Sequence, residues 1–200
     1  GGRDAAKRLL RRKEGLPAVT PQLICDAAVE LTQEHGLDRW SIRQLAAKLE
    51  VYPRAIYYHV EDRDAVVALV LDHVMEQVAL PDEGVPWDAW YRRFLGDLRT
   101  TMRAFPGVAQ RCALFGPGTG SAKAIMDAGM RVLADAGFGR DTVRVYDMLL
   151  SQTCQYVAQE DARDAMPSER RRMGAQYASN AEEGMLGVAG IGNVVKEAIA

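Results

Sequence analysis

The chain has 200 residues, of which 48% are hydrophobic and 26% are charged, and its formal net charge is -2 at pH 7. This composition excludes a disordered chain and allows one hydrophobic core, or a small domain joined to a larger one. No apolar run reaches the roughly 18 residues that a membrane span needs, and the first residues lack the apolar centre of a signal peptide. We therefore expect a cytoplasmic protein without membrane association.

A basic segment lies near the beginning of the chain, at residues 3–13. Five cations fall within seven positions: Lys7, Arg8, Arg11, Arg12 and Lys13. Such clustering is typical of an arm that meets a polyanion, although a charge run alone is more often a solvated, frayed terminus. We treat residues 1–19 as a basic N-terminal arm whose role depends on the domain that follows.

Helix signals begin at residue 20. Thr20 is a suitable N-cap, Pro21 suits the first helical position, and Gly36 stands where a left-handed C-terminal cap belongs, which predicts a helix of about four turns. Ser41 and Gln44 then have the spacing of a capping box. Behind this box, Ile42, Leu45, Ala46 and Leu49 repeat at helical spacing. The pattern predicts a short second helix with one face on the core.

Residues 50–52 interrupt the pattern, and Pro53 begins a third helix that we expect to run to about Val60. Three apolar side chains of this helix should face the small core: Ala55, Ile56 and Val60. Because Tyr57 and Tyr58 point about 100° apart on a helix, only one of them can be buried. We expect Tyr58 to be the buried one.

The rest of the chain also predicts helices. Asp62 or a neighbour caps a long fourth helix that ends near Pro81, and residues 81–86 form a linker. Further helical patterns cover 87–104, 107–114, 121–136, 141–158, 168–178 and a weak one from about 182. The prediction is an all-α fold, in which residues 20–65 form one domain and residues 66–200 a larger one.

The capped second helix, the short turn and the third helix match the helix-turn-helix arrangement, in which the third helix enters the major groove of DNA. Its polar and aromatic side chains would then be free to meet phosphates and base edges. Arg43 is a candidate for a guanine edge, and Arg63 for a backbone clamp. Taken alone, a histidine such as His59 or an arginine such as Arg43 is more often a solvated surface residue.

Residues 20–70, TPQLICDAAVELTQEHGLDRWSIRQLAAKLEVYPRAIYYHVEDRDAVVALV, resemble the DNA-binding domain of the tetracycline-repressor (TetR) family. The resemblance rests on the capping Ser-x-Arg, on Leu-Ala-x-x-Leu and on Tyr-x-His-Val. It implies a homodimer that binds palindromic operator DNA and releases it when a small molecule enters the larger domain. By position, it assigns base contacts to Arg43, Tyr52, Pro53 and Arg54, and phosphate contacts to Ser41, Tyr57, His59 and Arg63.

Two positions depart from the family pattern. Glu50 stands where the family usually has glycine, because the turn favours a positive φ. The region AQRCALFGPG (109–118) lacks the histidine that holds a magnesium–tetracycline complex in the tetracycline repressors. We therefore expect no metal and no cofactor. Cys25, Cys112 and Cys154 have no C-x-x-C spacing, so we expect reduced core cysteines rather than disulfides or a zinc site.

The larger domain should hold a mostly apolar effector pocket. The candidate pocket residues are Phe94, Leu98, Met102, Phe115, Met126, Met130 and Tyr146. Any single one of them is more often core than ligand contact. The segment GPGTGSAK lacks the spacing of a phosphate loop and is best interpreted as an interhelical loop bordering the pocket.

These patterns favour a ligand-responsive repressor that is not an enzyme, since nothing resembles a catalytic triad or a paired-carboxylate site. Helices near 141–158 and 182–200 would form the dimer, and the basic arm would add phosphate or minor-groove contacts. Two alternatives stay open. One is a DNA-binding regulator without a small-molecule effector, and the other is an all-α carrier or enzyme whose helix-turn-helix is architectural. Salt-dependent binding to duplex DNA would distinguish the regulators from the carrier.

Overall fold

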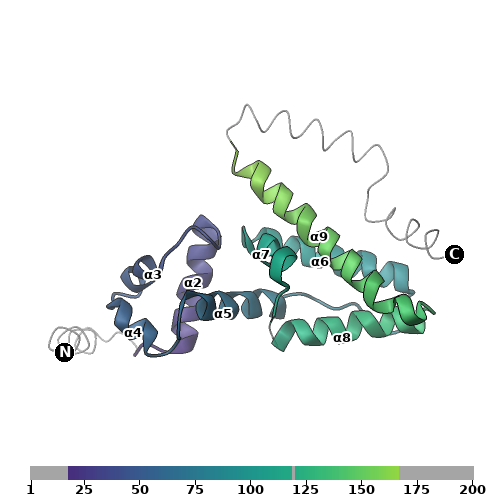
Figure 1. The fold of residues 1–200 in the computed structure, drawn as a ribbon, viewed down its shortest axis with the longest axis horizontal. Coiled ribbons are helices and arrows are strands. Elements are labelled where there is room, and N and C mark those ends of the chain that lie inside the picture. The colour runs from purple at the N-terminus through teal and green to yellow at the C-terminus, as the bar shows by residue number, and fades with distance from the viewer. Residues whose placement is uncertain (1–17, 119, 167–200) are drawn as a thin grey trace.

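The computed structural model describes residues 18–118 and 120–166 (Figure 1). The predicted basic residues of the arm and the helices expected at 168–178 and from 182 lie outside these ranges. Within them every regular element is helical, in agreement with the predicted all-α fold. The elements are α2 (Pro21–His35), α3 (Ile42–Lys48), α4 (Pro53–Tyr57), α5 (Arg63–Glu76), α6 (Trp87–Arg103), α7 (Val108–Phe115), α8 (Gly120–Asp135), η1 (Gly139–Asp141) and α9 (Thr142–Asp164). None of these helices is long and apolar enough to cross a membrane.

The predicted N-terminal caps are confirmed for the first two of these helices, whereas Gly36 ends α2 with φ 92° and ψ 151°, outside the expected left-handed helical conformation. The Thr20 hydroxyl accepts a hydrogen bond from the Leu23 amide at 3.1 Å, and Pro21 opens α2. Ser41 and Gln44 form the capping box of α3, with each side chain accepting from the backbone amide of the other. Such contacts satisfy amides that the first helical turn leaves without a partner. Asp62 caps α5 by accepting from the Ala65 amide at 2.8 Å.

The third helix is shorter than expected, and the prediction for Tyr58 is wrong. α4 ends at Tyr57, and Tyr58 is 86% exposed while Tyr57 is 50% exposed. Ile56 is the fully buried side chain of this helix. Because each residue turns the helix by about 100°, Tyr58 lies about 200° from Ile56 and points away from the core.

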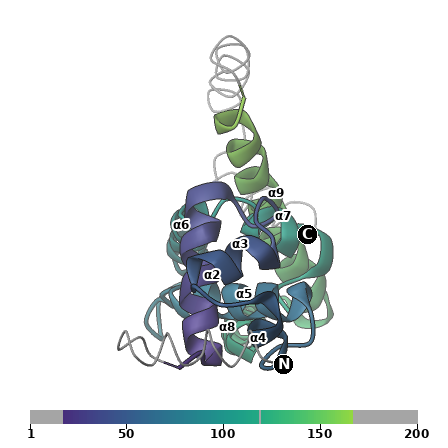
Figure 2. The same ribbon diagram turned by 90° about the vertical axis from the view of Figure 1, so that its left-hand side faces the viewer.

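The described helices form two domains joined by α5. Figure 1 shows α2, α3 and α4 at one end and α6 to α9 at the other, and Figure 2 views the molecule from the α2–α4 end. α5 packs against α2 in the smaller domain and against α8 in the larger one. It ends at Glu76, before the expected limit at Pro81. The helix thus touches both domains along its length.

α9 extends beyond its expected end near residue 158 and reaches Asp164. Acidic side chains in this last part pair with α6. Arg99 contacts Glu160 at 2.5 Å, and Arg103 contacts Asp161 at 2.6 Å and also Asp164. The Asp161 carboxylate additionally accepts from the Gly107 amide at 3.2 Å, at the start of α7. These pairs hold three helices of the larger domain together and account for the longer α9.

Candidate nucleic-acid interface and ligand cavity

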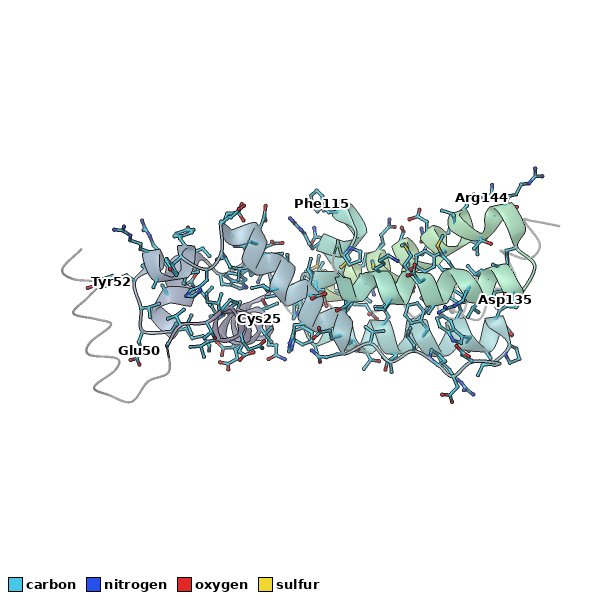
Figure 3. All side chains as sticks on the ribbon, turned by 90° about the horizontal axis from the view of Figure 1, so that it is seen from below. Cys25, Glu50, Tyr52, Phe115, Asp135 and Arg144 are labelled. Atoms are coloured by element: carbon cyan, nitrogen blue, oxygen red, sulfur yellow. The ribbon has the colours of Figure 1, made fainter. Side chains whose placement is uncertain are left out.

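The α3–turn–α4 unit presents its polar side chains at one end of the molecule. Arg43 on α3 and Arg54 on α4 are exposed, and Tyr52, which precedes α4, is 40% exposed. Figure 3 shows Tyr52 and Glu50 at this end and Asp135 and Arg144 at the opposite end. Of the four predicted base-contacting residues, Pro53 alone is half-buried. The structure therefore places these four residues on or beside one outward-facing unit.

Glu50 occupies a left-handed turn between α3 and α4. Its φ is 54°, and no other non-glycine residue described has a positive φ. The Glu50 amide donates to the Ala47 carbonyl at 3.0 Å and the Val51 amide to the Ala46 carbonyl at 2.9 Å. A left-handed conformation costs a residue with a Cβ about 1–2 kcal/mol. The expected mismatch between residue type and backbone is therefore present in the structure.

The predicted phosphate-contacting residues differ in how far they are engaged within the chain. Tyr57 and His59 are exposed, and the His59 ring lies 5.3 Å from that of Tyr58. The Ser41 hydroxyl already serves the α3 cap. Arg63 is half-buried at the start of α5. Three exposed or helix-capping polar groups thus flank the α3–α4 unit, and the fourth is tied into the fold.

Sequence reasoning missed this intramolecular role of Arg63. Its Nη2 donates to the Leu37 carbonyl at 2.5 Å, its Nε donates to the Trp40 carbonyl at 3.3 Å, and its guanidinium lies 4.5 Å from the Trp40 ring centroid. Trp40 is itself anchored through Nε1, which donates to the Thr32 hydroxyl at 3.0 Å. The guanidinium therefore fastens α5 to the segment that leads from α2 into α3. The long sequence separation gave no signal for this contact.

The larger domain contains a cavity of about 320 Å³ between α5, α6, α7, α8 and α9. Four of the seven predicted pocket residues line it: Leu98, Met102, Met126 and Tyr146. The other three do not. Phe94 is completely buried in the core, Phe115 is 68% exposed with its ring against the Arg111 guanidinium, and Met130 lies further along α8. Figure 3 shows Phe115 pointing outward from α7.

Several lining residues were not predicted. They are Met75 of α5, Cys112 of α7, Ala122, Lys123 and Ile125 of α8, and Asp147, Leu150, Ser151 and Cys154 of α9. Residues 116–118 of the GPGTGSAK segment also border the cavity, as expected for an interhelical loop. The helical spacing of Tyr146, Leu150 and Cys154 could have placed the last two beside the predicted Tyr146, since residues four apart share a face.

The inner part of the cavity is electrically neutral. All three cysteines are buried and free, and burial raises the pKa of Cys112 to about 12 and that of Cys154 to about 11. Burial likewise raises the pKa of Tyr146 to about 12, with a smaller contribution from Cys154. Desolvation disfavours the charged form of each group, so these side chains stay protonated at neutral pH. The inner lining of the cavity formed by these side chains therefore carries no ionised group.

The charged lining residues lie at the exposed side of the cavity. Lys123 and Asp147 are both exposed, and the Lys123 ammonium contacts Asp127 at 2.6 Å on the surface of α8. An apolar, neutral interior with charges only at its exposed side suits an uncharged molecule better than an ion.

One contact connects the cavity region directly to the α2–α4 domain, and a second connects it to α5. The Leu37 amide donates to the Pro106 carbonyl at 2.8 Å, in the turn between cavity-lining Met102 and Cys112. On the other side, Asp72 of α5 accepts from the Ser121 amide at 3.0 Å, in the first turn of α8. The segment between α6 and α7 is therefore bonded to the loop that leads into α3, and α8 is bonded to α5.

The comparisons with known proteins agree with this architecture. Residues 24–70 match the family described as bacterial regulatory proteins, tetR family. An HTH-type transcriptional regulator of Saccharopolyspora erythraea is 36% identical over 131 residues, which cover 64% of this chain and 54% of that relative. The chain thus spans about half the length of this curated relative.

Two further proteins extend the comparison over more of the chain. The tetracycline repressor protein class A from transposon 1721 of Escherichia coli is 27% identical over 154 residues, covering 75% of this chain and 71% of the repressor. The TetR family protein ActR of Streptomyces coelicolor, crystallised with (S)-DNPA, has a TM-score of 0.71 at 20% identity and covers 92% of this chain and 96% of its own. At that identity the likeness concerns the fold. Over residues 24–70 the chain thus matches the tetR family of bacterial regulatory proteins, and the similarity to the tetracycline repressor extends into the larger domain.

Proposed function

We propose that this chain is a ligand-responsive, DNA-binding transcription regulator that represses its target genes. The observation that carries the proposal is the pairing of an exposed helix-turn-helix at one end with an apolar cavity at the other, joined by α5. A relative named as a tetracycline repressor and a fold neighbour crystallised with a small molecule support the same reading.

In this proposal α4 enters the major groove. Arg43, Tyr52, Pro53 and Arg54 contact base edges, while Ser41, Tyr57, His59 and Arg63 contact phosphates. The basic residues at positions 7–13, outside the described ranges, add phosphate or minor-groove contacts. Arg43 and Arg54 support this assignment because both are exposed on the unit that presents Tyr52.

Groove geometry requires two copies of the chain. Successive major grooves on one face of DNA lie about 34–36 Å apart, and a single short α4 can occupy only one of them. We assign the dimer contact to α9 together with the chain near 182–200, and the symmetry of such a dimer makes the operator a palindrome. An inducer that switches occupancy almost completely must prefer the non-binding conformation by about 10⁴-fold.

The test is to select bound fragments from random DNA duplexes and to measure their affinity by fluorescence anisotropy at several salt concentrations. We expect a palindromic site and a steep linear fall of log affinity with log salt. Affinity that stays nearly constant with salt would contradict the proposal.

Two variants test the assigned contacts. Arg54→Ala should relax base preference at one position of each half-site and cost about 1–3 kcal/mol there. Tyr57→Phe removes one hydroxyl from a phosphate contact and should weaken binding to all sequences alike. The opposite pattern would mean that α4 meets the groove in another register.

A further inference from the structure

The cavity ends at a layer made by one residue from each of three helices. On α6, Tyr91 lies on the same stripe as the cavity-lining Leu98 and Met102, because residues seven and eleven positions apart share a helical face. On α8, Gly129 follows the cavity-lining Ile125 by four positions, and on α9 Tyr146 itself lines the cavity. Tyr146 lines the cavity, and Tyr91 and Gly129 lie next to it behind the lining; we call these three residues the tyrosine layer.

The Tyr91 hydroxyl is a buried donor without a partner. Tyr91 is 3% exposed, and among the described residues its hydroxyl is the one buried side-chain polar atom that makes no hydrogen bond. The rings of Trp90 and Phe94 pack against the Tyr91 ring, with ring centroids 5.1 and 6.0 Å away. Burial strongly raises the pKa of this phenol, so it stays protonated and able to donate. A buried hydroxyl without a partner destabilises the fold, and an acceptor supplied by a ligand would remove that penalty.

Gly129 leaves the space between the two tyrosines open. A Cβ at this position would lie 2.8 Å from the Tyr91 hydroxyl and 2.8 Å from Cε2 of Tyr146. Neither distance is compatible with a methyl group unless a ring moves. The Tyr91 hydroxyl and the edge of the Tyr146 ring therefore both lie next to the Gly129 backbone, and of the two tyrosines Tyr146 is the one that lines the cavity.

We propose that the effector is an uncharged, mainly apolar molecule carrying a hydrogen-bond acceptor such as a ketone oxygen, and that this oxygen accepts from Tyr91 once the Tyr146 ring turns aside. The inference rests on the proposed function, because it names the chemical class that the cavity recognises. An ionised ligand group is disfavoured at this depth, since the lining cysteines and Tyr146 are neutral. A hydrocarbon would fill the cavity but leave the Tyr91 hydroxyl without a partner.

The test uses two probes that differ by one atom group, 2-acetylnaphthalene and 2-isopropenylnaphthalene. The first carries a carbonyl oxygen where the second carries a methylene group. Dissociation constants for the full chain are measured by equilibrium dialysis. We expect the ketone to bind about tenfold more tightly, which corresponds to one hydrogen bond to a buried donor. Equal affinities, or no binding of either probe, would overturn the proposal.

Tyr91→Phe should stabilise the ligand-free protein and at the same time remove its preference for the ketone. Removing the hydroxyl that makes no hydrogen bond should raise the melting temperature of the ligand-free protein by roughly 2–4 °C. The same substitution should abolish the preference for the ketone and leave the affinity for the hydrocarbon unchanged. A variant that melts lower and binds both probes as before would indicate that solvent satisfies Tyr91, and would overturn the proposal.

Gly129→Ala tests the path between the tyrosines, and Gly96→Ala is its matched control. Gly96 also lies within a helix but a Cβ there meets no atom within 4 Å. We expect Gly129→Ala to lose the ketone preference and Gly96→Ala to keep it; identical behaviour of the two variants would contradict the assigned path. Salt-dependent DNA binding in the absence of probe is measured on all variants. If it is absent, the proposed function is contradicted, whatever the probe preference shows.

Discussion

Arg63 offers a direct test of how the helix-turn-helix is held. Arg63→Met keeps an unbranched side chain but removes the two hydrogen bonds to the Leu37 and Trp40 carbonyls and the contact with the Trp40 ring. A hydrogen bond from a charged group contributes about 1.5–3 kcal/mol, and a cation over an aromatic ring about 0.5–1 kcal/mol. Because the Nε bond is long at 3.3 Å and the side chain is half-buried, we take the lower ends. The short Nη2 bond and the ring contact alone then give about 2 kcal/mol, and the Nε bond raises this to about 3.5, so we expect a loss of about 2–3.5 kcal/mol of unfolding free energy.

Urea unfolding followed by circular dichroism measures this loss, with Arg63→Lys as the companion variant. Lysine keeps the charge but cannot make the forked contact, so it should recover only part of the stability. An unfolding free energy for Arg63→Met within about 0.5 kcal/mol of the parent, as for an ordinary surface substitution, would refute this reasoning.

The same variants separate the structural role of Arg63 from its assigned phosphate contact. If Arg63 also meets a phosphate, Arg63→Met should reduce the slope of log affinity against log salt by about 1, whereas Arg63→Lys should retain it. A slope that is unchanged in Arg63→Met would remove Arg63 from the phosphate contacts and leave its structural role intact.

Three further predictions concern stability. Glu50→Gly should stabilise the protein by about 1 kcal/mol by relieving the positive φ, while Glu50→Ala, which keeps the Cβ, should not; a lower melting temperature for the glycine variant would contradict this. Gly107→Ala should destabilise more than Gly137→Ala. Both glycines have φ near 90°, but only at Gly107 would a Cβ approach Leu37, at 3.2 Å, and equal melting temperatures would show that this contact yields freely. Stability should fall as pH rises above about 9, because unfolded thiols lose protons there while the pKa of folded Cys154 is about 11. Urea unfolding between pH 8 and 10 should show a shallower fall in Cys154→Ala, and identical slopes would exclude a contribution from this thiol.

Local signals made most of the fold predictable. The caps at Thr20, Ser41 and Asp62 each depend on residues within three positions, so the sequence alone contains the whole interaction. Tyr58 shows the limit of such reasoning. Its exposure follows from which residue of α4 is buried and from where that helix ends, and both depend on packing against α3.

The site was less predictable than the fold. Apolar character indicated Leu98, Met102, Met126 and Tyr146 as cavity residues, but it could not separate them from Phe94, which is equally apolar and lies in the core. Whether a residue lines the cavity depends on how five helices pack against one another, which no local sequence pattern predicts. The hydrogen bond from Arg63 to the Leu37 carbonyl could not be predicted for the same reason, since it joins residues distant in the chain.

The hydrogen bond between the Leu37 amide and the Pro106 carbonyl has a consequence for building hybrid regulators. It joins main chain to main chain, so the side chain of Leu37 matters at this joint only through its packing beside Gly107. Under the proposed function, the α2–α4 half of a related protein could be grafted onto the α6–α9 half of this chain, provided that the backbone of the two turns keeps its course and that the buried Leu37 beside Gly107 is kept. The joint would thus act as a generic coupling between interchangeable modules.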